Sequence, residues 1–225
     1  DEYNNTVRDL TGINVRPADR FPNDLTASSG FENSANSLFI QPVTLERYVG
    51  AAEAIVEAAW PAEPKTASQR RAWQRLIGEG VSLGEASLRK TKTVRAVLSR
   101  FATRAFRRHV EADELSSLVR HFEFRRQSGR SATNALREVL QVVLVSPSFL
   151  IRSEQNASEA GRPFPVSDWE LASRLSYFLW ASMPDDDLFR LAESGQLRKP
   201  AVLASQVDRM PVSYTHLRAH ETPLH

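Results

Sequence analysis

The sequence of 225 residues predicts an all-α protein, a multi-helix bundle-like assembly with one long irregular loop near the N-terminus. Apolar residues recur at helical spacing along most of the chain, and neither strand–turn–strand alternation nor an internal repeat is present. Prolines and glycines mostly separate the periodic segments. Hydrophobic residues make up 41% and charged residues 25% of the chain, a composition that excludes a disordered protein. No apolar run reaches the roughly 18 residues that a membrane-spanning helix needs.

The N-terminal quarter combines two predicted helices with a long loop. Residues 2–10 place apolar side chains on one side and stop at Gly12. Residues 13–41 are interrupted by proline, glycine and many Asn, Asp and Ser, but their large apolar groups indicate a loop that packs against the body. Pro42 begins a helix that is ended by Pro61.

The middle of the chain predicts four helices. Residues 67–77 and 85–107 are helical by composition and period, and a glycine-rich stretch separates them. Residues 111–127 form an amphipathic helix. Residues 132–145 are apolar on nearly all sides, so their length favours a central buried helix, while their valines leave a buried strand as the alternative.

The C-terminal part predicts three further helices and a tail. Ser167 and Glu170 match a capping box before a helix that ends at Met183, and three aspartates begin the next helix. A last helix covers residues 201–210. Residues 211–225 show no helical period and hold three of the five histidines, so we interpret them as a non-native, adaptor-derived tail and exclude a zinc site there.

The net charge of +2 conceals a polarity along the chain. Residues 1–64 hold four arginines against ten acids, residues 65–130 hold sixteen basic residues against six acids, and residues 131–225 hold nine against eleven. The basic segment 65–130 suits nucleic acid or another polyanion. We favour the alternative that its arginines pair with the acidic flanks or are solvated, since no aromatic residues are interleaved for stacking.

The densest cationic face of this segment consists of four arginines: Arg100, Arg104, Arg107 and Arg108. Guanidinium groups bind carboxylates, phosphates or haem propionates, so these residues are candidates for binding a polyanion or a partner. The alternative is a set of buried ion pairs, with Glu138 or Glu170 as partners, because burying an unpaired arginine is costly.

Two acidic clusters are candidate metal or catalytic sites. The first consists of possible calcium ligands in the N-terminal loop: Asp19, Asp24, Glu32 and Asn33. They lack the 1-3-5 spacing of a dedicated calcium loop, so turn formation by Asn and Asp is the alternative. The second consists of Asp185, Asp186 and Asp187. Their position at a helix start indicates capping first, with a metal or acid–base role as the alternative.

Several sequence motifs follow one another along the chain. They are Glu2-Tyr-Asn-Asn-Thr6, Arg16-Pro-Ala-Asp-Arg-Phe-Pro22, Gly30-Phe-Glu-Asn33, Leu45-Glu-Arg-Tyr48, Phe106-Arg-Arg108, Leu144-Val-Ser-Pro-Ser-Phe-Leu150, Leu171-Ala-Ser-Arg-Leu-Ser-Tyr-Phe-Leu-Trp180 and Met183-Pro-Asp-Asp186. Together they resemble three consecutive domains of a planctomycete-type family of cytochrome c-associated envelope proteins, domains without established chemistry. His109 departs from the family pattern, which commonly has proline after the arginine pair.

The resemblance implies a division of the chain and a larger context. The segments are a first family domain (1–60), a helical linker (61–92), a second, helical family domain (93–155), an incomplete third family domain (162–210) and the tail (211–225). Related proteins carry a c-type haem module upstream and further family domains downstream, so the chain is expected to be a fragment truncated at both ends.

The function implied by the resemblance is that of a non-catalytic helical module of a secreted or cell-surface, haem c-linked protein. The expected location is extracytoplasmic, and the expected partners are other domains of the same protein and a redox partner or surface polymer. The chain has no cysteine, so it has no Cys-x-x-Cys-His motif for attaching haem c within these residues.

Two alternatives remain open, and whether the protein is an enzyme is not decided. One is an extracytoplasmic oxidoreductase or glycan-acting enzyme with a site at the domain junction, for which Asp24, Arg104 and Asp185 are the residues to test. The other is a nucleic-acid or polyanion binder that uses segment 65–130, with nucleic acid the less favoured ligand.

Overall fold

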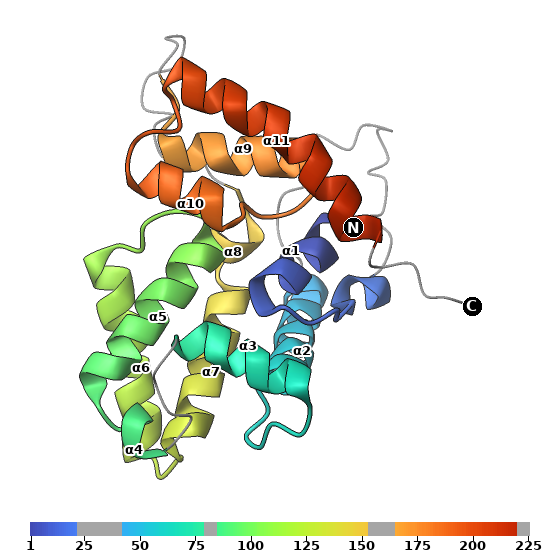
Figure 1. Ribbon diagram of the computed structural model, residues 1–225. Helices are drawn as coiled ribbons and strands as arrows, with labels where there is room; N and C mark the ends of the chain where they lie inside the picture. The colour runs from blue at the N-terminus through green and yellow to red at the C-terminus, as the bar shows by residue number, and fades with distance from the viewer. Residues whose placement is uncertain (22–41, 79–84, 153–164, 220–225) are drawn as a thin grey trace.

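The computed structural model describes residues 1–21, 42–78, 85–152 and 165–219 (Figure 1). Within these ranges the chain forms eleven α-helices and one 3-10 helix and no strand, which confirms the predicted all-α class. The elements are α1 (Glu2–Thr11), η1 (Pro17–Arg20), α2 (Pro42–Ala59), α3 (Ala67–Ile77), α4 (Glu85–Leu88), α5 (Thr91–Phe106), α6 (Ala112–Gln127), α7 (Ala132–Val145), α8 (Pro147–Leu150), α9 (Asp168–Trp180), α10 (Asp186–Glu193) and α11 (Pro200–Ala219).

Helix α7 is the central helix of the molecule, and the strand alternative for residues 132–145 is wrong. The helix packs against α2, α5 and α6. Leu136, Val139, Leu140 and Val143 are fully buried on it. Their i, i+3, i+4 and i+7 spacing places them along one side of a helix, so the burial pattern and the backbone agree.

Two tryptophans fix the corner between α2 and α3. The indole Nε1 of Trp60 donates to the carbonyl of Ala72 at 3.0 Å, and that of Trp73 donates to the carbonyl of Pro61 at 3.0 Å. Both side chains are fully buried, so each polar ring atom needs the partner it has. Helix α3 then starts at Ala67, and the side chain of Thr66 caps it.

The single helix predicted for residues 85–107 is wrong, because the chain breaks into α4 and α5 at Arg89 and Lys90. Leu88 and Val94 are both buried in the core. In a continuous helix, six residues would leave these two side chains pointing about 120° apart around the axis. The break allows both of them to face the same core.

Helices α9, α10 and α11 form a C-terminal unit at one end of the molecule, next to α5, α8 and α1 (Figure 1). We call the remaining helices the body. The C-terminal unit has an apolar cluster of its own, formed by Ala172, Trp180, Leu188, Ala192, Leu197 and Met210. Met183 and Phe189 of this unit belong instead to the large cluster of the body. The unit is therefore joined to the body by few apolar side chains.

The last helix is longer than predicted. Helix α11 begins at Pro200 and continues to Ala219, whereas the prediction ended it at residue 210. The prediction used apolar periodicity as its only criterion, and a helical backbone can continue where that period is absent. The non-native origin of residues 211–225 stays a prediction.

Candidate binding site

A pocket of about 890 Å³ lies between the body and α9, and we call it the junction pocket. Its walls come from the ends of α5 and α8, the start of α6 and several sides of α9, with Glu2 contributed by α1. Five of its lining residues are basic: Arg107, Arg108, His109, Arg152 and Arg174. The volume falls in the range of small-molecule sites.

Arg107 is the buried cation of this pocket. It follows α5 with a φ of 56° in the left-handed region, and its residue surface is only 5% exposed. Its guanidinium donates to the carbonyls of Ala105 at 2.9 Å, Ser148 at 3.2 Å and Phe149 at 3.0 Å. These carbonyls are uncharged acceptors near the ends of α5 and α8, where a cation is favoured.

The positive charge of Arg107 has no carboxylate partner among the ion pairs of the described residues. The aromatic rings of Phe149 and Tyr177 lie 5.9 and 5.8 Å from its guanidinium carbon. Burial lowers the pKa of Arg107, and the contact with Tyr177 partly offsets this shift. The group therefore supplies a fixed, uncompensated positive charge to the pocket wall.

Arg108 is held in place by a bidentate ion pair. Its two terminal nitrogens donate to the carboxylate of Glu114 at 2.8 and 2.7 Å, and Nη2 also donates to the hydroxyl of Ser148 at 3.1 Å. The hydrogen bonds from Arg108 hold the pKa of Glu114 below its ordinary value. Glu114 in turn accepts from the backbone of Glu111 at 3.0 Å, so the start of α6 fixes Arg108 at the pocket.

Arg152 lies at the more exposed side of the pocket. Its guanidinium carbon is 4.2 Å from the ring centre of Tyr177, and its Nη1 is 3.0 Å from Oε2 of Glu2. Both charged side chains are about half exposed. The Tyr177 hydroxyl and the Thr6 hydroxyl lie 2.8 Å apart, so the same ring connects α1 to α9.

Aromatic side chains complete the lining. Phe178 of α9 is 86% exposed, the highest value among the large exposed apolar residues of the described chain. Trp169 is half-buried, and its ring centre lies 5.8 Å from that of Phe189. The pocket thus presents cations, carboxylates and apolar rings together.

A second pocket of about 610 Å³ adjoins the first, and we call it the adjoining pocket. The two pockets share His109 and Trp169 as lining residues. The adjoining pocket is lined further by Arg75, Arg100 and Arg104. The four predicted arginines therefore lie in one region, but they do not form one helix face. Arg107 and Arg108 line the junction pocket, and Arg100 and Arg104 line the adjoining pocket.

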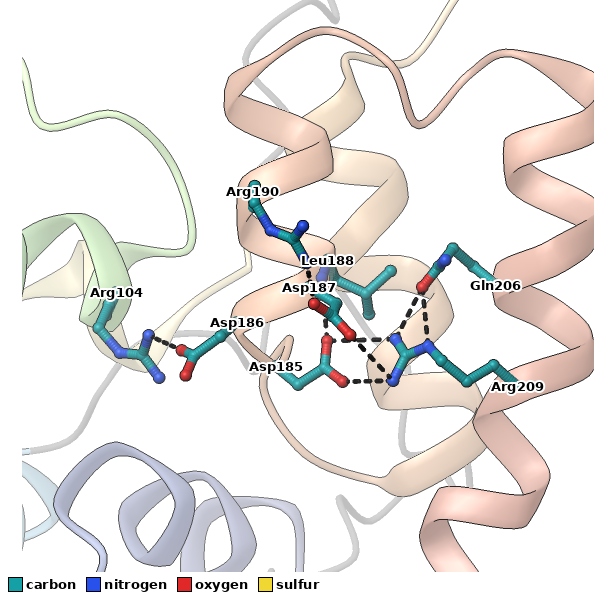
Figure 2. Close-up of polar contacts among 8 residues, drawn as sticks. All are labelled: Arg104, Asp185, Asp186, Asp187, Leu188, Arg190, Gln206 and Arg209. Carbon is teal, nitrogen blue, oxygen red and sulfur yellow. Dashed lines mark hydrogen bonds and ion pairs between the residues drawn. The ribbon is translucent and has the colours of Figure 1, made fainter.

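The three aspartates at the start of α10 pair with three arginines, and Arg209 contacts both Asp185 and Asp187 (Figure 2). Asp185 accepts from the backbone of Leu188 at 2.9 Å and from Arg209 at 2.7 Å. Asp186 pairs with Arg104, and Asp187 pairs with Arg190. The capping interpretation of Asp185 is therefore confirmed.

No group of three metal-binding side chains occurs within the part of the chain that the structure describes. Arg104 and Asp185, the two described residues of the enzyme alternative, each contact a different charged partner and not each other (Figure 2).

The predicted calcium ligands lie mostly outside the described residues. Asp24, Glu32 and Asn33 fall there, so the calcium site stays a prediction. Asp19 is described: one carboxylate oxygen accepts from Asn4 at 2.8 Å and the other from Arg16 at 2.8 Å. The hydrogen bond from Arg16 lowers the pKa of Asp19.

The alternative of buried ion pairs is met only in part: two of the arginines form ion pairs, but with partners other than Glu138 and Glu170, and the side chain that pairs with Arg104 is 85% exposed. Arg104 and Arg108 pair with Asp186 and Glu114. Glu138 pairs instead with Arg125 and Arg130 at the other end of α6 and α7.

Sequence reasoning missed Arg152, Trp169, Tyr177 and Phe178 as site residues. The last two lie in a quoted motif, but a motif does not show which of its side chains face a pocket. Arg152 lies 45 positions after Arg107 along the chain and reaches the same pocket only through the fold.

Three family models match the chain. PSD3, a protein of unknown function (DUF1587), matches residues 1–61; PSD5, a protein of unknown function (DUF1595), matches residues 93–154; and PSD4, a protein of unknown function (DUF1592), matches residues 166–220. The third match ends ten residues beyond the predicted end of that domain.

No curated protein and no solved structure matches the chain significantly. None of the helices within the described ranges is long and apolar enough to cross a membrane. The junction pocket is lined by residues of all three matched ranges. The chain therefore carries three consecutive domains of the PSD family, the planctomycete-type, cytochrome c-associated domains.

Proposed function

We propose that this chain is a non-catalytic helical module of a secreted or cell-surface protein that carries haem c in another part of its polypeptide, and that the junction pocket binds an anionic group of a partner. The observation that carries the binding role is Arg107. Within the described parts of the chain, this buried guanidinium has only neutral hydrogen-bond acceptors, and it lies in the wall of a pocket with three further arginines.

The physical argument concerns charge and backbone strain. A buried charge without an opposite charge costs several kcal/mol, which carbonyl dipoles and aromatic faces offset only in part. A residue other than glycine in the left-handed region adds about 1–3 kcal/mol of strain. Arg107 carries both costs at one position of a pocket, and a bound anion would supply the missing opposite charge.

The haem link and the location rest on the family alone. The chain has no cysteine, so its residues do not fit the covalent attachment of haem c. We therefore propose that the haem domain lies in a separate part of a longer protein. The proposed partner is a redox protein or a surface polymer outside the cytoplasm.

Citrate binding at low ionic strength tests the pocket. We expect saturable binding that quenches Trp169 fluorescence and weakens as salt is added.

Arg152→Gln should weaken citrate binding about tenfold, which corresponds to the loss of one charge-assisted hydrogen bond. Arg130→Gln is the matched control: it removes the same charge from a half-exposed ion pair at the far end of α6. Equal effects of the two variants, or no binding by the unmodified chain, would refute the pocket.

A further inference from the structure

The junction pocket and the adjoining pocket meet at Trp169 and His109, which line both, and we call the two pockets together the trough. A ligand that occupies both pockets would contact these two residues. It would also contact the arginines of the first pocket and those of the second, such as Arg100. An elongated ligand with several anionic groups fits this arrangement better than a compact one.

Carboxylates lie among these arginines. Glu2 and Glu111 line the junction pocket, and Asp186 and Glu193 line the adjoining pocket. Glu2 and Asp186 pair with Arg152 and Arg104, so these acids reduce the positive charge that a ligand made only of anions, such as a polyphosphate, would meet. A ligand that carries both carboxylates and hydroxyl groups satisfies both kinds of side chain, because hydroxyls donate to the acids while carboxylates accept from the arginines.

The aromatic residues indicate flat apolar ligand surfaces. Phe178 exposes 86% of its surface to solvent and contributes to the junction pocket, and Trp169 stands between the two pockets. Sugar rings offer apolar C–H faces that cover such side chains. Many peptides dock through a strand edge or an apolar helix groove, whereas an acidic peptide would bind the arginines without covering the aromatic side chains. The described residues contain no strand, and the trough mixes charged with apolar residues.

We propose that the trough binds a linear acidic polysaccharide, a chain of uronic acid units. Its carboxylates bind the arginines of both pockets, its hydroxyls bind the acids, and its rings cover Trp169 and Phe178. This inference rests on the proposed function, because it names the ligand class of the same pocket.

Oligomers of galacturonic acid test the proposal by calorimetry at low salt. The hexamer should bind about tenfold more tightly than the dimer, than hexaglutamate and than the neutral cellohexaose. Arg100→Gln should weaken binding of the hexamer and leave the dimer unchanged, because Arg100 belongs to the adjoining pocket.

Phe178→Ser should weaken binding of the hexamer by a larger factor than it weakens binding of citrate, because a sugar ring covers this side chain and citrate has no ring. Phe124→Ser is its matched control, since Phe124 is also exposed, at 59%, but lies on α6 outside both pockets. Hexaglutamate or cellohexaose binding as tightly as hexagalacturonate would overturn the polysaccharide proposal, and so would an unchanged Phe178→Ser variant. If citrate still binds in those cases, the anion-binding function stands. If citrate and every oligomer fail to bind, both proposals fall.

Discussion

The body and the C-terminal unit are stabilised in different ways. One continuous apolar cluster runs through the helices of the body and includes the fully buried residues of α7. The C-terminal unit has a smaller cluster and meets the body through polar contacts as well, such as Thr6 with Tyr177 and Arg104 with Asp186. The junction pocket lies along this second kind of contact.

The contacts that stabilise the two regions differ in how much each one contributes to the free energy of folding. Burying a leucine side chain contributes about 1.5–3 kcal/mol. A hydrogen bond contributes about 0.5–1.5 kcal/mol net, and an exposed ion pair about 0–1 kcal/mol. The contact between α1 and α9 is therefore expected to open more readily than the body, as ligand-binding regions often do.

The largest expected effect tests the body. Leu136→Ala removes a fully buried side chain from α7 and should lower the free energy of unfolding by about 2–5 kcal/mol. Urea denaturation followed by circular dichroism measures it. Leu45→Ala is the control, because Leu45 is 47% exposed and should change stability by about 0.5 kcal/mol or less. Similar losses in both variants would contradict a body that depends on α7.

A smaller effect tests the polar contact with the C-terminal unit. Tyr177→Phe keeps the aromatic ring but removes the hydroxyl that bonds Thr6 and should cost about 1 kcal/mol. Hydrogen exchange should quicken in α9 and α10 and stay unchanged in α7. A double-mutant cycle with Thr6→Val isolates the pair. Uniformly faster exchange over the whole chain would show that the two regions open together.

The next prediction concerns Glu85, whose polar contacts lie within the body and not at the contact with the C-terminal unit. Glu85 accepts from the backbone of Ala132 at 2.7 Å and of Thr133 at 3.3 Å, and so caps α7 from α4. The hydrogen bond from Ala132 is the main cause that lowers the pKa of Glu85. At neutral pH, Glu85→Gln should cost about 0.5–1 kcal/mol, as a partly exposed cap does.

The pH dependence of this effect has a defined sign. A depressed folded-state pKa gives stability that is complete above the unfolded value, about 4.5, and is lost as the pH falls through the folded value. The stability difference between Glu85→Gln and the unmodified chain should therefore shrink when denaturation is repeated below pH 4.5. If this stability difference stays constant as the pH falls below the folded-state pKa of Glu85, the charge of Glu85 does not contribute to stability.

The smallest effect is expected at Tyr3. Its hydroxyl is buried and has no hydrogen-bond partner among the residues that the structure describes, and burial raises its pKa well above the ordinary value. Tyr3→Phe should leave stability unchanged or raise it by up to about 1 kcal/mol, since an unsatisfied polar group is removed and the ring packing remains. A clear loss of thermal stability would reveal a partner for this hydroxyl.

Local signals explain which parts of the fold could be predicted from the sequence. The bounds of α3 and α7 and the caps at Ser167 and Asp185 depend on residues within one or two turns. The break after Leu88 could not be predicted, because both halves favour helix and only packing in three dimensions separates them.

The site was only partly predictable for a related reason. The four arginines were found by their density. Arg107, however, adopts a left-handed backbone conformation that ends α5, so Arg107 and Arg108 face a different pocket from Arg100 and Arg104. The residues of α9 that complete the pocket come from a distant part of the chain, and no local pattern links them to these arginines.

The left-handed conformation of Arg107 has an evolutionary consequence. Glycine suits that backbone geometry but supplies no charge, whereas lysine keeps the charge but cannot reach three carbonyls with a planar fork of donors. No single exchange satisfies both demands. Position 107 should therefore rarely be substituted among related proteins. A related protein that lacks this arginine should also have a different backbone turn after α5.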